Sequence, residues 1–495
     1  MTRLKGLSSA LLVPLLVLAS FNIAGAEVRL VDAVKAADKT AVRALLDQRV
    51  DVNAPQADGT TALHWAADGD NSEIVGLLIR AGANVKAANR YGVTPLWLAC
   101  MNGNAVTIEM LLEAGAEANT VLPEGETVLM TAARTGKVDA VKVLLGHGAD
   151  VNAKEGWHGQ TALMWAAAEG HPGVIQALVE RGAEIHVRSN GGFTALLFAA
   201  REGQIGAVQA LLKAGANLNE SLPGKAPERA DAAAGSTESE IGLDTFLLAA
   251  ANAHYELAAW LLDQGADPNA APQGWTALHQ VSWVRKAGVS GSNNPAPEGS
   301  GNMDSLEFVR KLVAKGATLN AQVTKRPGMG VTTLNSIGAT PFLLAARTAD
   351  AELMRLLAAL GADPRLPNED DTTPLMVAAG LGTQSPGEDP GTEPEVLEAV
   401  NVALELGNEL NAVDKNGETV MHGAAYKHAP SVVHFLAEKG ARIEVWDQQN
   451  KKGWTPLKIA EGVQRGMNIV SSPPTAAAIR EVMAAVTATS ARQPQ

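Results

Sequence analysis

Three histidines are the side chains best suited to proton transfer or metal binding, because an imidazole changes charge near neutral pH. His64, His279 and His422 each stand three residues after a threonine, in the phrases TALH, TALH and TVMH. His422, His428 and His434 follow one another at intervals of six. That spacing does not give the same-face i, i+4 pair of a helical zinc site, so we predict no bound metal.

Other constellations with chemical potential are incomplete. The sequence has no Gly-x-x-x-x-Gly-Lys phosphate loop, no His-Glu-x-x-His and no Cys-x-x-Cys-His. Residues 288–291 (GVSG) fall one residue short of a Gly-x-Ser-x-Gly nucleophile elbow. The acidic groups at 369–371 and 388–389 lack the ordered carboxylate spacing of a calcium loop. We therefore predict a chain that is not an enzyme, has no catalytic residues and needs no cofactor.

A seven-residue phrase, Thr-x-Leu-x-x-Ala-Ala, organises the elements around these residues. Its clearest copies begin at Thr61, Thr94, Thr127, Thr161 and Thr194, spaced by 33, 33, 34 and 33 residues. Displaced copies follow at Thr245, Thr276, Thr340, Thr373, Thr419 and Thr455. A constant period of this size indicates a solenoid of stacked units, none of which can bury its apolar face alone.

Each period is expected to hold two helices. Thr127 suits a helix N-cap, because its hydroxyl can accept from the free amides of the first turn. A second apolar pattern predicts a helix over 138–145, and Gly148 suits its left-handed C-terminal residue. An extended polar turn then leads to the next threonine. Cys100, the only cysteine, takes an alanine slot of the phrase and is expected to be buried.

The phrase TALHWAA, the segment GADVNA and the turn DKNG at 414–417 resemble the ankyrin repeat. The resemblance covers about residues 28–487. It implies an all-α repeat solenoid: an ankyrin array of stacked helix-turn-helix units with β-hairpin-like fingers. It also implies that the histidines of the phrase bond local backbone, and that the chain binds another protein through finger tips and the exposed face of the first helices.

The first 26 residues have the pattern of a secretory signal peptide. Arg3 and Lys5 precede an apolar run over 11–19, and Ala24-Gly25-Ala26 forms a small-x-small cleavage signature. The alternative is a retained membrane anchor, which the short run and Pro14 disfavour. We predict a bacterial, exported protein that is periplasmic or secreted and has no stable membrane insertion after cleavage.

The remaining chain divides by its period. We expect an N-terminal capping repeat at 27–57, a repeat array at 58–450, a C-terminal capping repeat at 451–487 and a disordered tail at 488–495. Gly-, Pro- and Ser-rich insertions are predicted within the array at 220–241, 284–303, 322–338 and 380–393. They either extend a binding edge or are tolerated surface loops.

The charge balance narrows the class of partner. The chain has 40 basic and 53 acidic residues and no Lys/Arg block, so we predict no nucleic-acid binding. The expected partner is a protein.

Large rings at the expected finger tips are the candidate binding residues, because exposed aromatic groups suit binding hot spots. They are Tyr91, Trp157, His158, Phe193, Trp275 and Trp454. The alternative is that each ring folds over its own finger. Glu169, Arg201 and Glu202 follow the first helices and are candidate polar rim residues. Trp65, Trp165 and Phe198, within those helices, are expected in the core.

These observations support a non-enzymatic protein-binding scaffold. One alternative is a regulatory or inhibitory module of a secreted enzyme, or an extracellular effector. A third class is a hydrolase whose site lies in an insertion, which the absence of a nucleophile–base pair disfavours.

Overall fold

The computed structural model describes residues 29–223, 242–286, 297–325, 334–465 and 468–490. Within them the chain is almost entirely helical and forms two compact units. The first unit contains 29–199 and 204–217, and the second contains 200–203, 218–223 and the described residues from 242 onward. The signal peptide predicted at 1–26, most of insertion 220–241 and the middle of insertions 284–303 and 322–338 lie outside the described residues.

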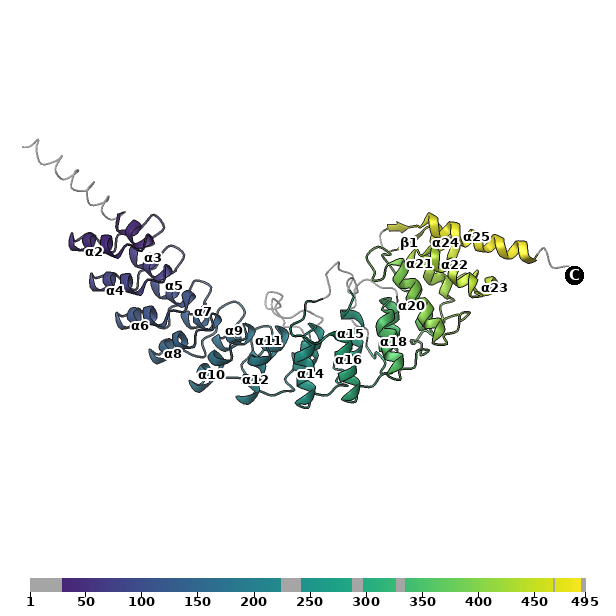
Figure 1. The fold of residues 1–495 in the computed structure, drawn as a ribbon, viewed down its shortest axis with the longest axis horizontal. Helices are drawn as coiled ribbons and strands as arrows, with labels where there is room; N and C mark the ends of the chain where they lie inside the picture. The colour runs from purple at the N-terminus through teal and green to yellow at the C-terminus, as the bar shows by residue number, and fades with distance from the viewer. Residues whose placement is uncertain (1–28, 224–241, 287–296, 326–333, 466–467, 491–495) are drawn as a thin grey trace, which may run out of the picture. The chain divides into compact units, whose positions relative to one another are not determined.

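The first unit is a regular series of helix pairs (Figure 1). A helical segment at 29–35 precedes α2 (Lys39–Asp47). The pairs that follow are α3 (Ala62–Asp68) with α4 (Ser72–Arg80), α5 (Pro95–Asn102) with α6 (Ala105–Glu113), α7 (Val128–Arg134) with α8 (Val138–Gly146), α9 (Ala162–Ala168) with α10 (Pro172–Glu180), and α11 (Ala195–Arg201) with α12 (Ile205–Lys213). The all-α repeat solenoid expected from the period is confirmed.

The second unit has the same alternation with longer interruptions. Its pairs are α13 (Thr245–Ala251) with α14 (Tyr255–Asp263), α15 (Ala277–Val284) with α16 (Ser305–Ala314), α17 (Pro341–Arg347) with α18 (Ala351–Ala359), α19 (Pro374–Ala378) with α20 (Glu393–Glu405), and α21 (Val420–Lys427) with α22 (Pro430–Glu438). It closes with α23 (Ile443–Trp446), α24 (Pro456–Glu461), an antiparallel pair of strands, β1 (Val463–Arg465) and β2 (Asn468–Val470), and α25 (Pro473–Ser490).

The C-terminal end contains the β1–β2 pair, in which Val463 faces Val470, and one difference from the expectation. Helix α25 extends to Ser490, three residues into the tail predicted to be disordered at 488–495. Apolar residues of its inner face, including Ile479, are buried, and α25 packs on α22 and α24, so packing prolongs the helix beyond its local signals.

The helix boundaries follow the predicted local chemistry. The Thr127 hydroxyl accepts a hydrogen bond from the Met130 amide at 3.2 Å, which confirms its role as N-cap. Helix α8 begins at Val138, as the apolar pattern predicts. Gly148, predicted as a left-handed C-terminal residue, has a φ of 82°, and the glycine that follows the second helix in other repeats also has a positive φ, as at Gly361 with 105°.

Neighbouring repeats pack helix on helix in two layers. In the first unit α3, α5, α7 and α9 pack successively on one another, and α4, α6, α8, α10 and α12 form the second layer (Figure 1). The paired alanines of the phrase, such as Ala132 and Ala133, are completely buried between layers, which lets the helices approach closely. Cys100 is also completely buried, as expected, and burial raises the pKa of its thiol.

Each finger, the extended turn that joins one repeat to the next, bonds to its neighbour through the backbone. The Arg90 amide donates to the Asp58 carbonyl at 2.9 Å, and the Asn190 amide donates to the His158 carbonyl at 2.7 Å. The second unit repeats the bond from Lys415 to Asp370 at 2.8 Å. The finger tips are therefore held in a row at a fixed spacing.

The asparagine of GADVNA joins consecutive repeats in a second way. Asn152 Nδ2 donates to the Gly182 carbonyl at 3.1 Å, and its Oδ1 accepts from the Glu184 amide at 2.9 Å. The Gly182 carbonyl belongs to the end of the next second helix, where backbone acceptors lack intrahelical partners. One side chain thus satisfies two backbone groups of the following repeat.

Candidate functional site

The tip of the finger before α9 presents the most exposed aromatic side chain of the described residues. Trp157 retains 65% of its accessible surface. Its ring stacks on that of His158 with centroids 5.4 Å apart and planes 9° from parallel. The Trp157 ring at the end of the finger is therefore open to solvent, whereas His158 beneath it is half-buried.

A buried carboxylate fixes the backbone beneath this pair. Glu155 is 7% exposed, and its oxygens accept from the amides of Trp157 at 2.6 Å, His158 at 2.7 Å and Gln160 at 2.9 Å. From the next finger, Asn190 Nδ2 donates to the Trp157 carbonyl at 2.8 Å. The aromatic pair thus stands on a rigid base, which lowers the entropy lost when a partner orders it.

The sequence interpretation did not identify Glu155. Its signal was positional, because other fingers place a side chain with the same role there. Asn89 Oδ1 accepts from the Tyr91 and Val93 amides at 3.0 and 3.1 Å, and Asp414 Oδ1 accepts from the Asn416 and Glu418 amides, each at 2.8 Å. A short acidic or amide side chain that bonds its own turn is the usual solution, and glutamate replaces it here.

Tyr91 lies two fingers before Trp157 and is 57% exposed. The Arg90 guanidinium carbon lies 4.8 Å from the centre of its ring, and Arg90 Nη2 donates to the tyrosine hydroxyl at 2.6 Å. Val121, on the finger between them, is 54% exposed. Tyr91, Val121, Trp157 and His158 therefore form a series over three successive fingers, here called the finger surface.

Three of the predicted finger aromatics do not belong to an exposed surface. Phe193 is completely buried and stacks on Phe198 with centroids 4.9 Å apart, so the expectation of an exposed ring is wrong there. Trp275 is half-buried, and its ring centroid lies 5.8 Å from that of Trp283 in an edge-on arrangement. Trp454 is half-buried with Lys452 Nζ 5.1 Å from its ring centre. Trp275 packs against a buried cluster that includes Leu343 and Leu344 of α17, in the following repeat. In all three, burial of the ring removes apolar area from water.

The predicted polar rim lies elsewhere. Glu169 is exposed and caps the C-terminal end of α9, a helix length of about 10 Å from the finger end. Arg201 ends α11, and its Nε lies 3.0 Å from Glu202 Oε1. These residues are positioned by helix ends rather than by fingers, so they do not join the finger surface.

Cations cover part of the first-helix face. Arg134 lies 5.3 Å from the ring centre of Trp165, and Lys35 Nζ lies 3.9 Å from that of Trp65. Both tryptophans are half-buried rather than core residues as predicted, whereas Phe198 is buried as predicted. Stacking on a cation lets a ring remain partly exposed at little cost.

The three histidines of the phrase are structural, as predicted. The Thr61 amide donates to His64 Nδ1 at 3.1 Å, so Nε2 carries the proton and donates to the Val93 carbonyl at 3.0 Å. His279 and His422 make the same two kinds of bond. Burial lowers the pKa of His279 and of His422 to about 4, which keeps each imidazole neutral with both nitrogens occupied.

A second polar cluster, which the sequence did not indicate, lies under β1. Glu418 is 8% exposed, and its Oε1 accepts from Tyr426 Oη at 3.1 Å and Asn450 Nδ2 at 2.9 Å. The guanidinium carbon of Arg465 lies 5.0 Å from the centre of the Tyr426 ring, and Arg465 Nη1 donates to the backbone carbonyl of Tyr426 at 2.8 Å. Burial raises the pKa of Glu418 to about 7, so this carboxyl group titrates near neutral pH.

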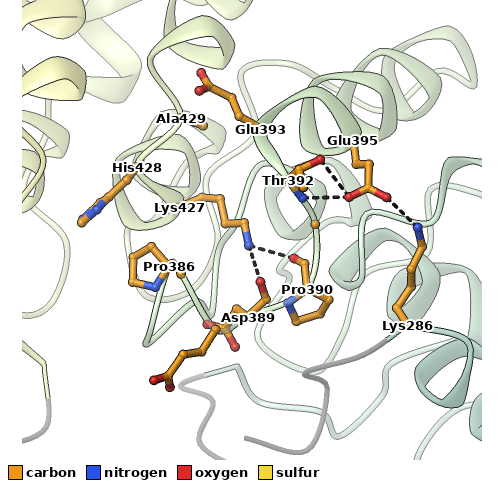
Figure 2. Close-up of a pocket in the computed structure, with 13 residues that line it drawn as sticks. Lys286, Pro386, Asp389, Pro390, Thr392, Glu393, Glu395, Lys427, His428 and Ala429 are labelled. Carbon is orange, nitrogen blue, oxygen red and sulfur yellow. Dashed lines mark hydrogen bonds and ion pairs between the residues drawn. The ribbon is translucent and has the colours of Figure 1, made fainter. Parts of the chain in front are cut away.

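The second unit also contains a cavity of about 720 Å³ (Figure 2). The loop 386–392 forms one wall, and the N-terminal turn of α20 and the turn between α21 and α22 form the others. Its charged lining includes Lys286, Glu388, Asp389, Glu393, Glu395 and Lys427. Such a mixture of charges in a concave site can hold small polar molecules.

The described residues lack two kinds of site. No group of three or more His, Cys, Asp or Glu side chains in the described part of the chain is arranged to hold a metal ion. Of the helices that the structure describes, none combines the length and the apolar character needed to cross a bilayer.

Comparison with known proteins identifies ankyrin repeats directly. A family profile described as ankyrin repeats (3 copies) matches residues 30–121, 107–189 and 158–221. A second profile, described as ankyrin repeats (many copies), matches residues 246–283. Ankyrin repeats are therefore present in this chain.

Curated relatives share only short segments. An ankyrin repeat domain-containing protein of cowpox virus (strain Brighton Red) is 28% identical over 76 residues, which is 15% of this chain and 11% of the relative. Ankyrin repeat protein 14 of vaccinia virus (strain Western Reserve) is 28% identical over 75 residues, 15% of this chain and 30% of the relative. The chain thus spans less than a third of either relative, and the likeness is to the repeat.

Proposed function

We propose that this ankyrin-repeat array is a non-enzymatic scaffold that binds a protein partner on the finger surface of its first unit. The observation that carries the proposal is the geometry of Trp157. A ring exposed by 65% is stacked on His158 while its backbone is fixed by Glu155 and Asn190. Exposed aromatic groups on rigid backbone are the usual anchors of protein–protein interfaces.

The other finger-surface residues extend this anchor over three repeats. Tyr91 is held by its stacked Arg90, and Val121 adds apolar area between the two rings. An interface needs a buried apolar centre with polar groups around it. Arg90 and His158 supply polar groups directly beside the rings. The rim first predicted at Glu169, Arg201 and Glu202 is not needed for this surface.

Export is a further part of the proposal and rests on the sequence alone. The pattern of residues 1–26 supports a cleaved signal peptide, and with it a periplasmic or secreted bacterial protein. The alternative, a regulatory or inhibitory module of a secreted enzyme or an extracellular effector, differs in where the chain is found. Fractionation into cytoplasm, periplasm and medium distinguishes these locations.

The binding surface is tested by affinity capture of partners and by measurement of their dissociation constants. The chain from residue 27 onward is used to capture partners, which are identified by mass spectrometry, and the dissociation constant of a purified partner is then measured. Trp157→Ala is expected to weaken binding about 30-fold or more, as for a hot spot worth about 2 kcal/mol.

The matched control is Val413→Ala, because Val413 is also an exposed apolar finger residue, 51% exposed, but lies in the second unit. It is expected to leave binding unchanged. Equal affinity of the wild type and Trp157→Ala for every captured partner would remove the finger surface from the proposal.

A further inference from the structure

Lys427 is a buried lysine that lines the 720 Å³ cavity of the second unit. It is the last residue of α21 and only 7% exposed. Its stem packs against the backbone of Gly380, where an added Cβ would collide with Lys427 Cβ. The side chain is therefore held in one direction, toward the loop that closes the cavity (Figure 2).

The Lys427 ammonium has backbone partners but no counter-ion among the described residues. Its Nζ donates to the carbonyls of Asp389 at 2.9 Å and Pro390 at 2.8 Å. Among the residues that the structure describes, no carboxylate oxygen lies within ion-pair distance of Nζ. A neutral amine keeps two N–H groups, so both carbonyl bonds survive when the ammonium loses a proton.

The surroundings increase the share of that neutral amine. Burial lowers the pKa of Lys427 to about 8; Asp389 and Glu395 oppose the shift, and the guanidinium of Arg347 adds to it. Arg465 donates to the carbonyl of Tyr426, the residue before Lys427. Desolvation beside other cations is the usual way in which a protein makes a lysine nucleophilic.

Lys286 lines the same cavity but, unlike Lys427, has a carboxylate partner. Its Nζ lies 2.8 Å from Glu395 Oε1, and this bond is the largest cause that lowers the pKa of Glu395 to about 2 (Figure 2). A carboxylate at that distance favours the charged ammonium, which has no free electron pair. One cavity therefore presents one lysine paired with an acid and one held only by carbonyls.

We propose that Lys427 is a nucleophilic amine that captures small aldehydes or ketones entering this cavity. Its lone pair attacks the carbonyl carbon, a C–N bond forms, and the carbonyl oxygen leaves as water with the two amine hydrogens, giving an imine. A protonated imine retains one N–H, enough for one of the two backbone carbonyls. This activity is independent of partner binding on the finger surface.

Reductive labelling of the folded chain tests this inference. The chain is treated with propanal and cyanoborohydride at pH 7.5, which reduces each imine to a stable secondary amine, and initial labelling rates of the individual lysines are measured by peptide mass spectrometry. Lys427 is expected to react about ten-fold faster than Lys286, because the Lys427 amine is held only by two carbonyls whereas the Lys286 ammonium is paired with Glu395.

The comparison within one protein needs no variant, so it does not depend on whether a substitution folds. Lys427→Arg, which keeps donors for the two carbonyls, is expected to remove the fast phase and leave the labelling of Lys286 unchanged. Low urea distinguishes reaction in the cavity from reaction after local opening. A Lys427 rate equal to or below that of Lys286, or one that rises in proportion to unfolding, overturns the inference.

Discussion

The two units of this chain use the same repeat but treat polar side chains differently. In the first unit the phrase recurs every 33 or 34 residues. Polar side chains there bond the backbone of their own finger, as Asn89 and Glu155 do, or the backbone of the next repeat, as Asn152 does. In the second unit insertions lengthen the period and bring charged groups into buried positions. Lys427 and Arg465 each reach backbone carbonyls at least 37 residues away in the sequence.

This difference has a physical consequence. A side chain that bonds its own repeat needs no distant partner, so its environment is the same in every copy. A charged group buried under an insertion depends on the exact fold of that insertion, and burial shifts its titration. The second unit, which contains His279, His422, Glu418 and Lys427, is therefore the part whose stability depends most on pH.

The largest expected effect is acid destabilisation of the second unit. The pKa of His279 and of His422 is about 4 in the folded chain, against 6.5 when unfolded. Because the pKa is lowered in the folded chain, the stability that each neutral histidine contributes is fully present above pH 6.5 and is lost as the pH falls toward 4. The loss is roughly 3 kcal/mol for each histidine. Hydrogen exchange is expected to show α15 and α21 losing protection over this window.

A variant of one histidine checks the origin of this loss. His422→Gln is expected to lower stability at pH 7, because the bond to the Trp454 carbonyl is weakened. Its free energy of unfolding is also expected to change less between pH 6.5 and pH 4 than that of the wild type. Urea unfolding at several pH values measures this. If the free energy of unfolding of the variant falls with pH as steeply as that of the wild type, protonation of His422 is not the cause.

The second effect concerns fingers of the first unit. Phe193→Ala is expected to destabilise the chain by about 3–5 kcal/mol, because it removes a completely buried ring stacked on Phe198. Trp157→Ala is expected to change stability by less than about 0.5 kcal/mol. Urea unfolding of both variants measures the difference, and similar losses would contradict the division between buried and exposed finger rings.

The third effect opposes the first. The pKa of Glu418 is about 7 in the folded chain, above its ordinary value of 4.5. Because the pKa is raised in the folded chain, the stability that the protonated Glu418 contributes is fully present below pH 4.5 and is lost as the pH rises through 7. Glu418→Gln, which stays neutral, is therefore expected to stabilise the chain at pH 8 by roughly 3 kcal/mol.

The pH at which Glu418→Gln is measured supplies its control. At pH 5 the wild-type carboxyl group is protonated in the folded chain but largely ionised in the unfolded chain. The variant is therefore expected to be only about 1 kcal/mol more stable than the wild type there, against roughly 3 kcal/mol at pH 8. A stabilisation that is the same at pH 5 and pH 8 would show that the gain does not come from titration.

The smallest effect tests the periodic bonds. Asn119 Nδ2 donates to the Gly148 carbonyl at 3.0 Å, and its Oδ1 accepts from the Asp150 amide at 2.7 Å. Both bonds are exposed, so Asn119→Ala is expected to cost about 1 kcal/mol, with faster hydrogen exchange confined to the neighbouring repeats. A loss as large as that of Phe193→Ala would mean that these bonds contribute more than the core does.

The candidate site was only partly predictable. Exposure at Tyr91 and Trp157 followed from their place in the finger, but Phe193 occupies an equivalent finger and is completely buried. Phe193, Trp275 and Trp454 each stand directly before the capping threonine and are buried or half-buried. Tyr91 and Trp157 stand three and four residues before it, at the finger tip. Glu155 and Lys427 gave no signal of their own, because their roles depend on partners in other segments.

The sequence by itself determined the repeat, its helix boundaries and the structural role of its histidines. Each rests on interactions within a few residues or on a period that recurs, as Thr127 and Gly148 show. Only the tertiary structure decided how deeply each ring before a capping threonine is buried and which charges are buried. These properties depend on contacts between segments far apart in the chain, as between Lys427 and the loop at 389–390, and no local spacing encodes such contacts.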